Sequence, residues 1–305
     1  MTAPDGGRGS TTVAVGYDGS EAAQEAVRWA AEYAAAGNFR LRVVHAWVWP
    51  VFTKNLRSVK GVEGSGLRHP AEAIHAEGVE LGRDARAAAG TAVPAPARGT
   101  ATETAAGADP GVEGLLETGL PAPVLRDATR EARLLVISSR GIGGVPGQIA
   151  GSVCLDLAGS SPCPLMVIRR LRSPGQSPGP VVVGFDGTSR SAAALTGAVR
   201  LAEILGAALE VVHIDQRGRT AEGHGRHTRH GQELLDHALG EARKLAPGLS
   251  ISGVLREGHA ASKELLAAAG NAEVLVIGTH NRRGSPGNTV TAVLKKARCN
   301  VLITR

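Results

Sequence analysis

The chain has 305 residues, of which 43% are apolar and only 3% are aromatic, and its formal net charge is +6. This length is typical of two domains, and a core of Val, Leu, Ile and Ala suits parallel strands covered by helices. The composition argues against nucleic-acid binding, because the positive charge is spread along the chain without a basic stripe or an aromatic platform.

The first half of the sequence alternates between strand patterns and helix patterns. After a tail at 1–9, which we expect to be disordered, a strand is predicted at 12–18 and a helix at 20–37, with Ser20 as N-cap and Gly37 at its end. The stretch 91–110, rich in Ala, Pro and Thr, is expected to form an extended loop. The other predicted strands and helices of this half alternate at 41–47, about 70–90, 111–119, 121–132, 134–138, from 152 and 164–169.

Five sequence blocks of the first half recur in the same order in the second half, which indicates a duplication. VAVGYDGS at 13–20 returns as VVVGFDGT at 181–188, and LRVVHAW at 41–47 returns as LEVVHID at 209–215. The other pairs are GLLETG with GVLREG, LLVISSRG with VLVIGTHN, and CPLMVIRR with CNVLITR. The second half is therefore predicted to alternate in the same way, at 181–186, 190–206, 209–214, 230–246, 249–257, 260–270, 274–278, 289–298 and 300–304.

Strands that alternate with helices favour parallel pairing and right-handed crossovers. We therefore predict an α/β fold of two tandem doubly wound domains, with helices on both faces of each sheet. Their predicted bounds are 10–170 and 180–305. The linker at 171–179 is rich in Pro, Gly and Ser, which favour turns over regular elements.

The cysteines and the ends of the sequence bear on the environment of the protein. Cys154, Cys163 and Cys299 form no CxxC pair and are odd in number, so neither a disulfide framework nor a four-thiolate metal site is expected. The sequence contains no apolar segment typical of a secretory signal or a membrane span. We expect a cytoplasmic protein with reduced thiols and no contact with a membrane.

A ligand site is expected beyond the carboxyl ends of the strands, where open α/β sheets bind their ligands. A P-loop is excluded because no GKS or GKT occurs, and GYDGSE at 16–21 is not a dinucleotide fingerprint. The glycine-rich loop SSRGIGGVPGQIAGSV at 138–153 remains. In it, Gly141 is followed after nine residues by Gly151 and Ser152 at a helix start, a spacing that could wrap phosphates through backbone N–H groups.

Both halves resemble universal stress protein domains. The residues that carry the likeness are VGYDGS after the first strand, VVHAW at the second, ETG at the third, and ISSRG, GSV and SPCPLMVIR at the end of the first half. The resemblance covers 10–170 and 180–305. It implies a five-stranded parallel sheet of order 3-2-1-4-5 in each domain, and pairing of the two domains through their fifth strands, as an intramolecular imitation of the family's usual dimer.

The family's ATP-binding signature, G-x-x-G-x(9)-G-[ST], aligns with Ser138, Gly141, Gly151 and Ser152 in the first half, where three of four positions match. In the second half we align it with Gly278, Asn281, Thr291 and Ala292, where only Gly278 matches. The resemblance thus implies that the first domain binds ATP, with Mg²⁺ accompanying it, and that the second binds it weakly or not at all.

By the same resemblance, Asp18 would contact the nucleoside and Ala46 would pack on the adenine. The remaining predicted binding residues of the first domain are Gly16, Ile137, Ser138, Arg140, Gly141, Gly151, Ser152 and Val153. The weaker equivalents in the second domain are Asp186, Ile214, Gly278 and His280.

Other interpretations of these residues remain open. The glycine loop could serve only packing, and Asp18 and Asp186 could cap the helices that follow them. The tract HGRHTRH, with its histidines at 224, 227 and 230, could bind a metal, but a solvated helix start is the interpretation we favour. No catalytic set of side chains is predicted, so slow ATP hydrolysis is the most that we expect.

The function that we predict is a stress-response protein that binds ATP and acts as a nucleotide-responsive signalling module. The alternative is a stress protein that binds no nucleotide and works through protein–protein interaction. We name an adenine nucleotide, a second copy of the chain and an unidentified protein as candidate partners, and expect no nucleic acid or membrane among them.

Overall fold

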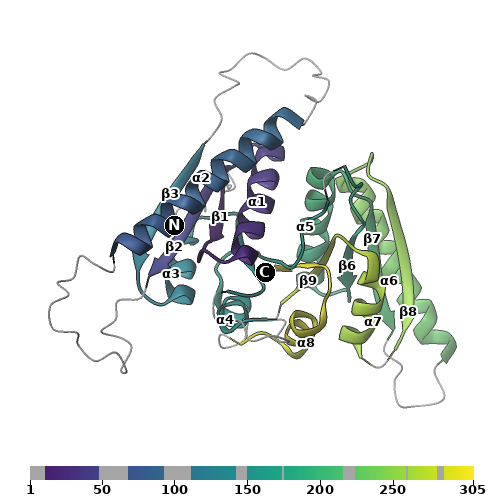
Figure 1. Cartoon of the computed structure of the whole chain (residues 1–305). Coiled ribbons are helices and arrows are strands. Elements are labelled where there is room, and N and C mark those ends of the chain that lie inside the picture. Colours follow the sequence, from purple (N-terminus) through teal and green to yellow (C-terminus); the bar gives the residue numbers. More distant parts are fainter. Residues whose placement is uncertain are drawn as a thin grey trace, which may run out of the picture.

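The computed structural model describes residues 11–47, 68–92, 111–141, 150–173, 175–215, 224–258, 260–279 and 285–305. The predicted tail at 1–9 lies outside these ranges. Strands and helices alternate through both halves (Figure 1). The elements of the first half are β1 (Thr12–Gly16), α1 (Glu21–Ala36), β2 (Arg40–Trp47), α2 (Arg68–Ala92), β3 (Val112–Thr118), α3 (Pro121–Ala128), β4 (Leu134–Ser138), α4 (Ser152–Ser160) and β5 (Leu165–Ile168).

The second half repeats this order. After α7 the chain adds one short 3₁₀ turn, η2 (Ala269–Asn271). The elements are β6 (Val181–Phe185), α5 (Ser189–Leu205), β7 (Leu209–Asp215), α6 (His224–Leu245), β8 (Ile251–Glu257), α7 (Ala261–Ala268), β9 (Val274–Gly278), α8 (Asn288–Lys296) and β10 (Asn300–Thr304).

The ten strands form one continuous sheet with the order β3-β2-β1-β4-β5-β10-β9-β6-β7-β8. Each half therefore has the predicted order 3-2-1-4-5, and its strands pair in parallel. The two halves join through β5 and β10, which pair antiparallel with Met166 opposite Leu302. The expected pairing of the two domains through their fifth strands is confirmed.

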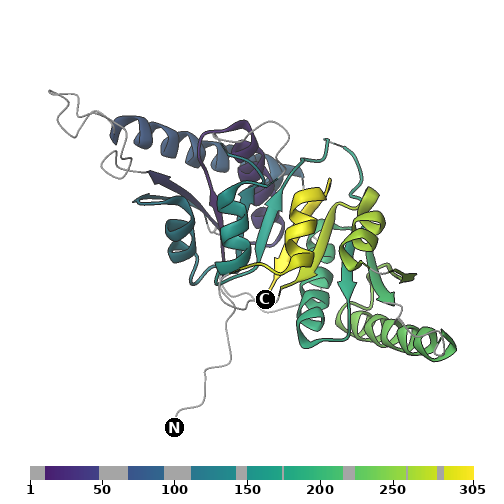
Figure 2. The same ribbon diagram turned by 90° about the horizontal axis from the view of Figure 1, so that it is seen from below.

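Helices cover both faces of this sheet, so the molecule has three layers (Figures 1 and 2). One apolar core lies between the sheet and α1, α2, α5 and α6, and a second lies between the sheet and α3, α4, α7 and α8. Each core contains residues of both halves. Buried apolar surface therefore runs without a break across the junction of β5 and β10, and the hydrophobic effect stabilises the two domains together.

The helix ends of the two halves are formed by the residues that the sequence patterns indicate. Ser20 caps α1, because its side chain accepts a hydrogen bond from Ala23 N, and Thr188 caps α5 through Ser191 N. Gly37 is the C-cap of α1 as predicted, but its φ is −92°, and the left-handed residue is Asn38 with φ 52°. Asparagine tolerates that conformation better than most residues do.

Several predicted bounds differ from the structure, most clearly at α2, α3 and α6. Helix α6, predicted at 230–246, begins at His224. Helix α2 continues to Ala92, so the predicted extended loop at 91–110 begins with helix, and 93–110 lie outside the described residues. Helix α3 ends at Ala128 rather than at 132, because Thr129 Oγ donates to Leu125 O at 2.7 Å and the chain then turns into β4.

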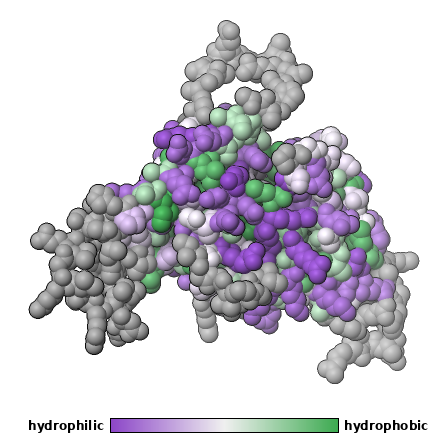
Figure 3. Space-filling view, in the orientation of Figure 1, coloured by the Kyte–Doolittle hydropathy of each residue, from purple (hydrophilic) through white to green (hydrophobic). Residues whose placement is uncertain are grey.

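The surface that faces the viewer in Figure 3 is mainly hydrophilic, with small scattered apolar areas. In the described part of the chain, Leu120 and Leu245 are large hydrophobic residues with exposed side chains. None of the helices in the described ranges is both long and apolar enough to cross a membrane.

Candidate functional site

A cavity of about 470 Å³ opens in the first domain beyond the carboxyl ends of β1 and β4. This is the place at which strand order reverses, because β1 pairs with β2 on one side and with β4 on the other. All ten site residues predicted for the first domain line the cavity: Gly16, Asp18, Ala46, Ile137, Ser138, Arg140, Gly141, Gly151, Ser152 and Val153.

Asp18 is held by the turn that leads into α1. Its Oδ1 accepts hydrogen bonds from Ser20 N at 3.0 Å and from Ser20 Oγ at 2.6 Å. Gly19 between them has φ +83°, which favours glycine. Asp18 thus supports the N-terminus of α1 indirectly, through the capping residue, while its carboxylate also lines the cavity.

Gly141 lies where the glycine-rich loop passes the carboxylate of Asp18, which would have to shift to admit a side chain at position 141. A Cβ at position 141 would lie 2.4 Å from Asp18 Oδ2, closer than real Cβ atoms come to a neighbour. At the start of the same loop, the hydroxyl of Ser138 donates to Arg140 O and holds this turn. Ser138 therefore replaces the signature glycine without leaving its hydroxyl unpaired.

The loop returns to its own start at Gly151, whose N–H donates to Ser139 O at 3.0 Å. Gly151 is the N-cap of α4, with φ −74° and ψ 166°, and has no side chain to cap the helix. The free N–H groups of the first turn give a helix N-terminus its partial positive charge. Because Ser152 and Val153 of that turn line the cavity, an anionic group bound there would be stabilised.

Six further lining residues are missing from the sequence-based set: Tyr17, Val44, Pro121, Leu125, Ser139 and Cys154. Tyr17 and Ser139 are chain neighbours of predicted residues, and a closer reading of the motifs could have found them. Pro121 and Leu125 come from α3, which carries no recognisable motif. Only the packing of α3 beside β1, seen in the approach of Leu125 to within 3.1 Å of a Cβ built on Gly16, places them here.

Tyr17 connects the cavity wall to α2. Its hydroxyl donates to Glu77 Oε1 at 2.7 Å, and Gln24 of α1 donates to the same oxygen. Burial and the Glu77 carboxylate together raise the pKa of Tyr17 to about 12. The corresponding residue of the second domain, Phe185, has no hydroxyl for such a contact.

The histidines at the ends of β2 and β7 have equivalent contacts. His45 Nδ1 lies 2.8 Å from Tyr17 O, and His213 Nδ1 lies 2.8 Å from Phe185 O. Each is only 7% exposed and joins two neighbouring strand ends. These contacts give both histidines a structural role at the strand ends.

A smaller cavity of about 210 Å³ occupies the equivalent place in the second domain. Asp186, Ile214 and Gly278 line it, whereas the predicted His280 lies outside the described residues. Asp186 Oδ1 accepts from Thr188 N at 3.0 Å and from Thr188 Oγ at 2.6 Å, as Asp18 does from Ser20.

The first turn of α5 narrows this second cavity. Thr188, Arg190 and Ser191 line it, whereas no residue of α1 lines the first cavity. A Cβ at position 278 would lie 2.9 Å from Arg190 O, so glycine is needed at this strand end. The second domain therefore has Gly278 at the position of Ser138, because the start of α5 lies too close to this strand end for a side chain.

The sequence-based alignment of Thr291 and Ala292 with Gly151 and Ser152 is wrong. Helix α8 begins at Asn288, and its N-cap is Gly287 with φ −64° and ψ 164°, which is close to the conformation of Gly151. Thr291 N donates to Gly287 O, inside the first turn of the helix. The connection from strand to N-cap is therefore four residues shorter in the second half, 279–286 against 139–150, and the N-cap glycine is kept.

The buried thiol in the first cavity is unreactive in character. Cys154 is 2% exposed, and burial raises its pKa to about 12, so the thiolate is not populated near neutrality. Among the described residues, no group of His, Cys, Asp and Glu side chains is placed to hold a metal ion. Of the HGRHTRH tract, the side chains at 224–229 lie outside the described set.

Known proteins match the chain along its whole length. The profile of the Universal stress protein family matches residues 9–169 and 179–305. Universal stress protein Rv1996 of Mycobacterium tuberculosis (strain ATCC 25618 / H37Rv) is 30% identical over 96% of this chain and 94% of its own length. Universal stress protein Rv2005c of the same strain is 28% identical over 96% of both chains.

A solved structure shows the same fold. The crystal structure of a universal stress protein from Archaeoglobus fulgidus DSM 4304 matches 97% of each chain with a TM-score of 0.65, at 15% sequence identity. Together with the profile match to both halves, these relatives identify the chain: it belongs to the universal stress protein family and carries two domains of that family in tandem.

Proposed function

We propose that the chain is a cytoplasmic, nucleotide-responsive stress or signalling protein that binds ATP mainly in the first cavity. The observation that carries the proposal is the convergence of all ten predicted binding residues on one cavity. They come from β1, β2, β4, the glycine-rich loop and α4, which are separated in sequence by up to 137 positions, from Gly16 to Val153. A cavity with an apolar wall, a few polar groups and a helix N-terminus has the general character of a nucleotide site.

The residues of the cavity suggest how ATP would lie. Apolar side chains of Val44, Ala46 and Leu125 would pack against the adenine, and the carboxylate of Asp18 would accept hydrogen bonds from the nucleoside. The backbone N–H groups at Ser152 and Val153, at the start of α4, would face the phosphates. When bound, Mg²⁺ would coordinate phosphate oxygens of ATP and neutralise part of their negative charge.

Two glycine positions support this arrangement of the phosphate end. At Gly141 a side chain would collide with Asp18, so the backbone is exposed beside the carboxylate. At Gly151 the nearest atom to an added Cβ is Ser139 O at 3.8 Å, so the local backbone would accept a side chain. The glycine there leaves open space at the mouth of the helix N-terminus, which a ligand could occupy.

The structure offers a direct test, because Gly151 and Gly287 are equivalent N-caps with room for a side chain. We would titrate the full chain with Mg-ATP by calorimetry as wild type, Gly151→Leu and Gly287→Leu. The wild type should bind ATP, Gly151→Leu should lose the dominant binding event, and Gly287→Leu should keep it. Circular dichroism and urea unfolding would check that both variants fold.

The alternative function, a protein that works through partner binding without nucleotide, is separated by the same experiment. If the wild type binds no ATP, the nucleotide proposal fails and the alternative takes its place. If Gly151→Leu binds as the wild type does while Gly287→Leu does not, ATP binds in the second domain and our choice of cavity is wrong.

A further inference from the structure

Two arginines cross the junction between the domains in equivalent ways. Arg169 directly follows β5, and Arg305 directly follows β10, at matching positions of the repeated blocks CPLMVIRR and CNVLITR. Arg305 Nη2 donates to Leu157 O at 3.0 Å and to Ala158 O at 3.1 Å, in the last turns of α4. Arg169 Nη2 donates to Leu294 O, near the end of α8. Each domain thus places a guanidinium on a helix of the other.

The positions of these contacts on the helices are informative. Leu157 and Ala158 lie among the last four residues of α4, where the helix end carries a partial negative charge. Leu157 O also accepts from Ser161 N at 2.9 Å, so Arg305 is a second donor to that carbonyl. A guanidinium stabilises such an end both by hydrogen bonds and by its charge. The opposite end of α4, at Gly151 and Ser152, lines the first cavity. At 1.5 Å per residue, nine residues of helix separate the two ends by only about 13 Å.

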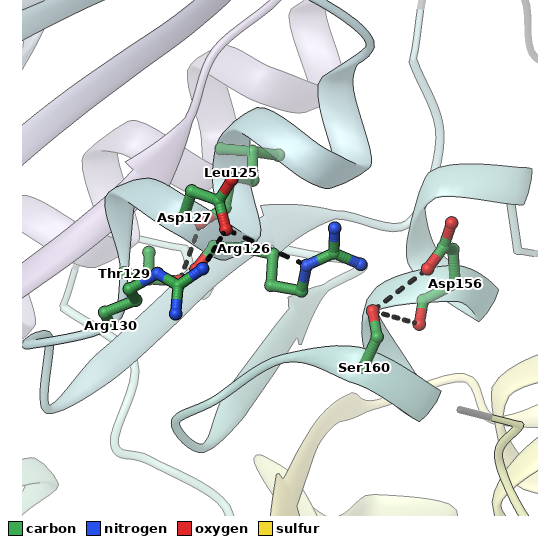
Figure 4. Close-up of polar contacts among 7 residues, drawn as sticks. All are labelled: Leu125, Arg126, Asp127, Thr129, Arg130, Asp156 and Ser160. Atoms are coloured by element: carbon green, nitrogen blue, oxygen red, sulfur yellow. Dashed lines mark hydrogen bonds and ion pairs between the residues drawn. The ribbon is translucent and has the colours of Figure 1, made fainter. Parts of the chain in front are cut away.

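Further contacts lie within α4 and beside it. Its last turn closes on itself through Ser160, whose hydroxyl donates to Asp156 O and to Asp156 Oδ1, both at 2.9 Å (Figure 4). Helices α4 and α8 also lie side by side over β5 and β10 (Figures 1 and 2). A short helix braced in this way is expected to shift as one body when either end changes its contacts.

We propose that α4 couples the first cavity to the second domain, with Arg305 as the residue that transmits the coupling. A ligand anion at the N-terminus of α4 and the Arg305 guanidinium at its C-terminus act on opposite ends of the same dipole and hold the helix in the same position. Each therefore strengthens the other. By linkage, domain pairing raises the affinity of the first cavity, and ligand in that cavity tightens domain pairing by the same factor.

The mirror-related contact sets a comparison. Arg169 holds α8, whose N-cap is Gly287, through Leu294 O, and its guanidinium also lies close enough to Cys154 of α4 and to Arg140 to act on both electrostatically. Arg305, which donates to two carbonyls of α4, should therefore affect that helix and the first cavity more strongly than Arg169 does. The inference rests on the proposed nucleotide site, but its effect on α4 can be measured without a ligand.

The experiment compares the full chain as wild type, Arg305→Ala, Arg305→Lys and Arg169→Ala. Hydrogen exchange without ligand reports the opening of α4 and α8, and calorimetry with Mg-ATP reports the affinity of the first cavity. Arg305→Ala should speed exchange in α4 but not in α8, and should weaken ATP binding by about 5-fold or more, the lower range of typical coupling. Arg169→Ala should speed exchange mainly in α8 and should weaken ATP binding less than Arg305→Ala does.

Arg305→Lys keeps the positive charge near the helix end, but lysine cannot reproduce the geometry in which one guanidinium donates to two carbonyls. Its α4 exchange rate and its ATP affinity should therefore lie between those of the wild type and those of Arg305→Ala. It also covers the case in which Arg305→Ala does not fold. Unchanged α4 exchange in a folded Arg305 variant would overturn the coupling, as would equal effects of Arg305→Ala and Arg169→Ala on α4. If α4 exchange responds as expected but the wild type binds no ATP, the stabilisation of α4 by Arg305 stands, whereas the nucleotide proposal fails and the coupling to ATP fails with it.

Discussion

Asn300 is the side chain on which the junction of the two domains most directly depends. It is fully buried at the start of β10, and its Oδ1 accepts hydrogen bonds from Arg169 N at 2.9 Å and from Arg170 N at 3.2 Å. These N–H groups lie just beyond the end of β5, where the ladder with β10 stops at Val167 and Val301. The amide therefore continues the pairing of the two domains past the last backbone contact.

We predict that Asn300→Ala lowers the free energy of unfolding by about 1 to 2 kcal/mol. Two hydrogen bonds of about 1 kcal/mol each are lost. The segment of Arg169 and Arg170 is partly exposed, so water can replace some of the loss. Asn300 Nδ2 is buried without a partner in the described structure, and removing it returns part of the cost of its burial.

Urea unfolding of the full chain, followed by circular dichroism, measures this change as a lower midpoint with the slope retained. The matched control is Thr196→Ala, which removes one exposed hydrogen bond on α5 to Ala192 O and should change stability by less than about 0.5 kcal/mol. A midpoint for Asn300→Ala that equals that of the control would refute the assignment of Asn300 as a stabilising contact between the domains.

Three further predictions concern the first cavity. Gly141→Ala should weaken Mg-ATP binding at least about 10-fold in calorimetry, because its Cβ would lie 2.4 Å from Asp18 Oδ2 and displace that carboxylate; unchanged affinity would remove the carboxylate from the proposed site. Tyr17→Phe should cost about 1 kcal/mol in urea unfolding through loss of the 2.7 Å bond to Glu77, with ATP affinity retained, since Phe fills the same place in the second domain. Burial raises the pKa of Cys154 from 9.0 to about 12 in the folded state, so the unfolded state loses this proton first and the free energy of unfolding should fall as pH rises from 9 towards 12. The difference in unfolding free energy between the wild type and Cys154→Ala should therefore change over this range, and a constant difference would contradict the burial of the thiol.

Local patterns in the sequence were sufficient for the elements. The alternation of apolar runs with helical periods predicts every strand of both halves, and capping residues such as Ser20 predict where α1 begins. The resemblance to the universal stress protein family supplied ten of the sixteen residues that line the first cavity, and these ten sit at strand ends and at a helix start. This works because parallel strands in a doubly wound sheet bring their carboxyl ends to one edge, so residues far apart in sequence are placed together by topology alone.

Alignment of the two halves was less reliable where the loop length changes. The offset between the two halves is four residues smaller for the last pair of blocks, CPLMVIRR and CNVLITR, than for the pair before it. The second half therefore lacks four residues between these blocks, but the offset does not show at which positions. Only the position of the first turn of α8 shows that Gly287, and not Thr291, corresponds to Gly151. Helix start signals near SPGN are ambiguous in sequence, because Pro, Gly and Asn all favour turns and caps.

By itself, the sequence determined the duplication and the alternation of strands and helices, because each of these rests on a local pattern repeated along the chain; the ten predicted residues of the first cavity came from the family resemblance. The tertiary structure alone decided the size of the second cavity, narrowed by the first turn of α5, and the crossing of Arg169 and Arg305 to helices of the opposite domain. Those contacts depend on how close two packed elements come and on the antiparallel meeting of β5 with β10, and such distances between residues more than 100 positions apart leave no periodic signal in a sequence.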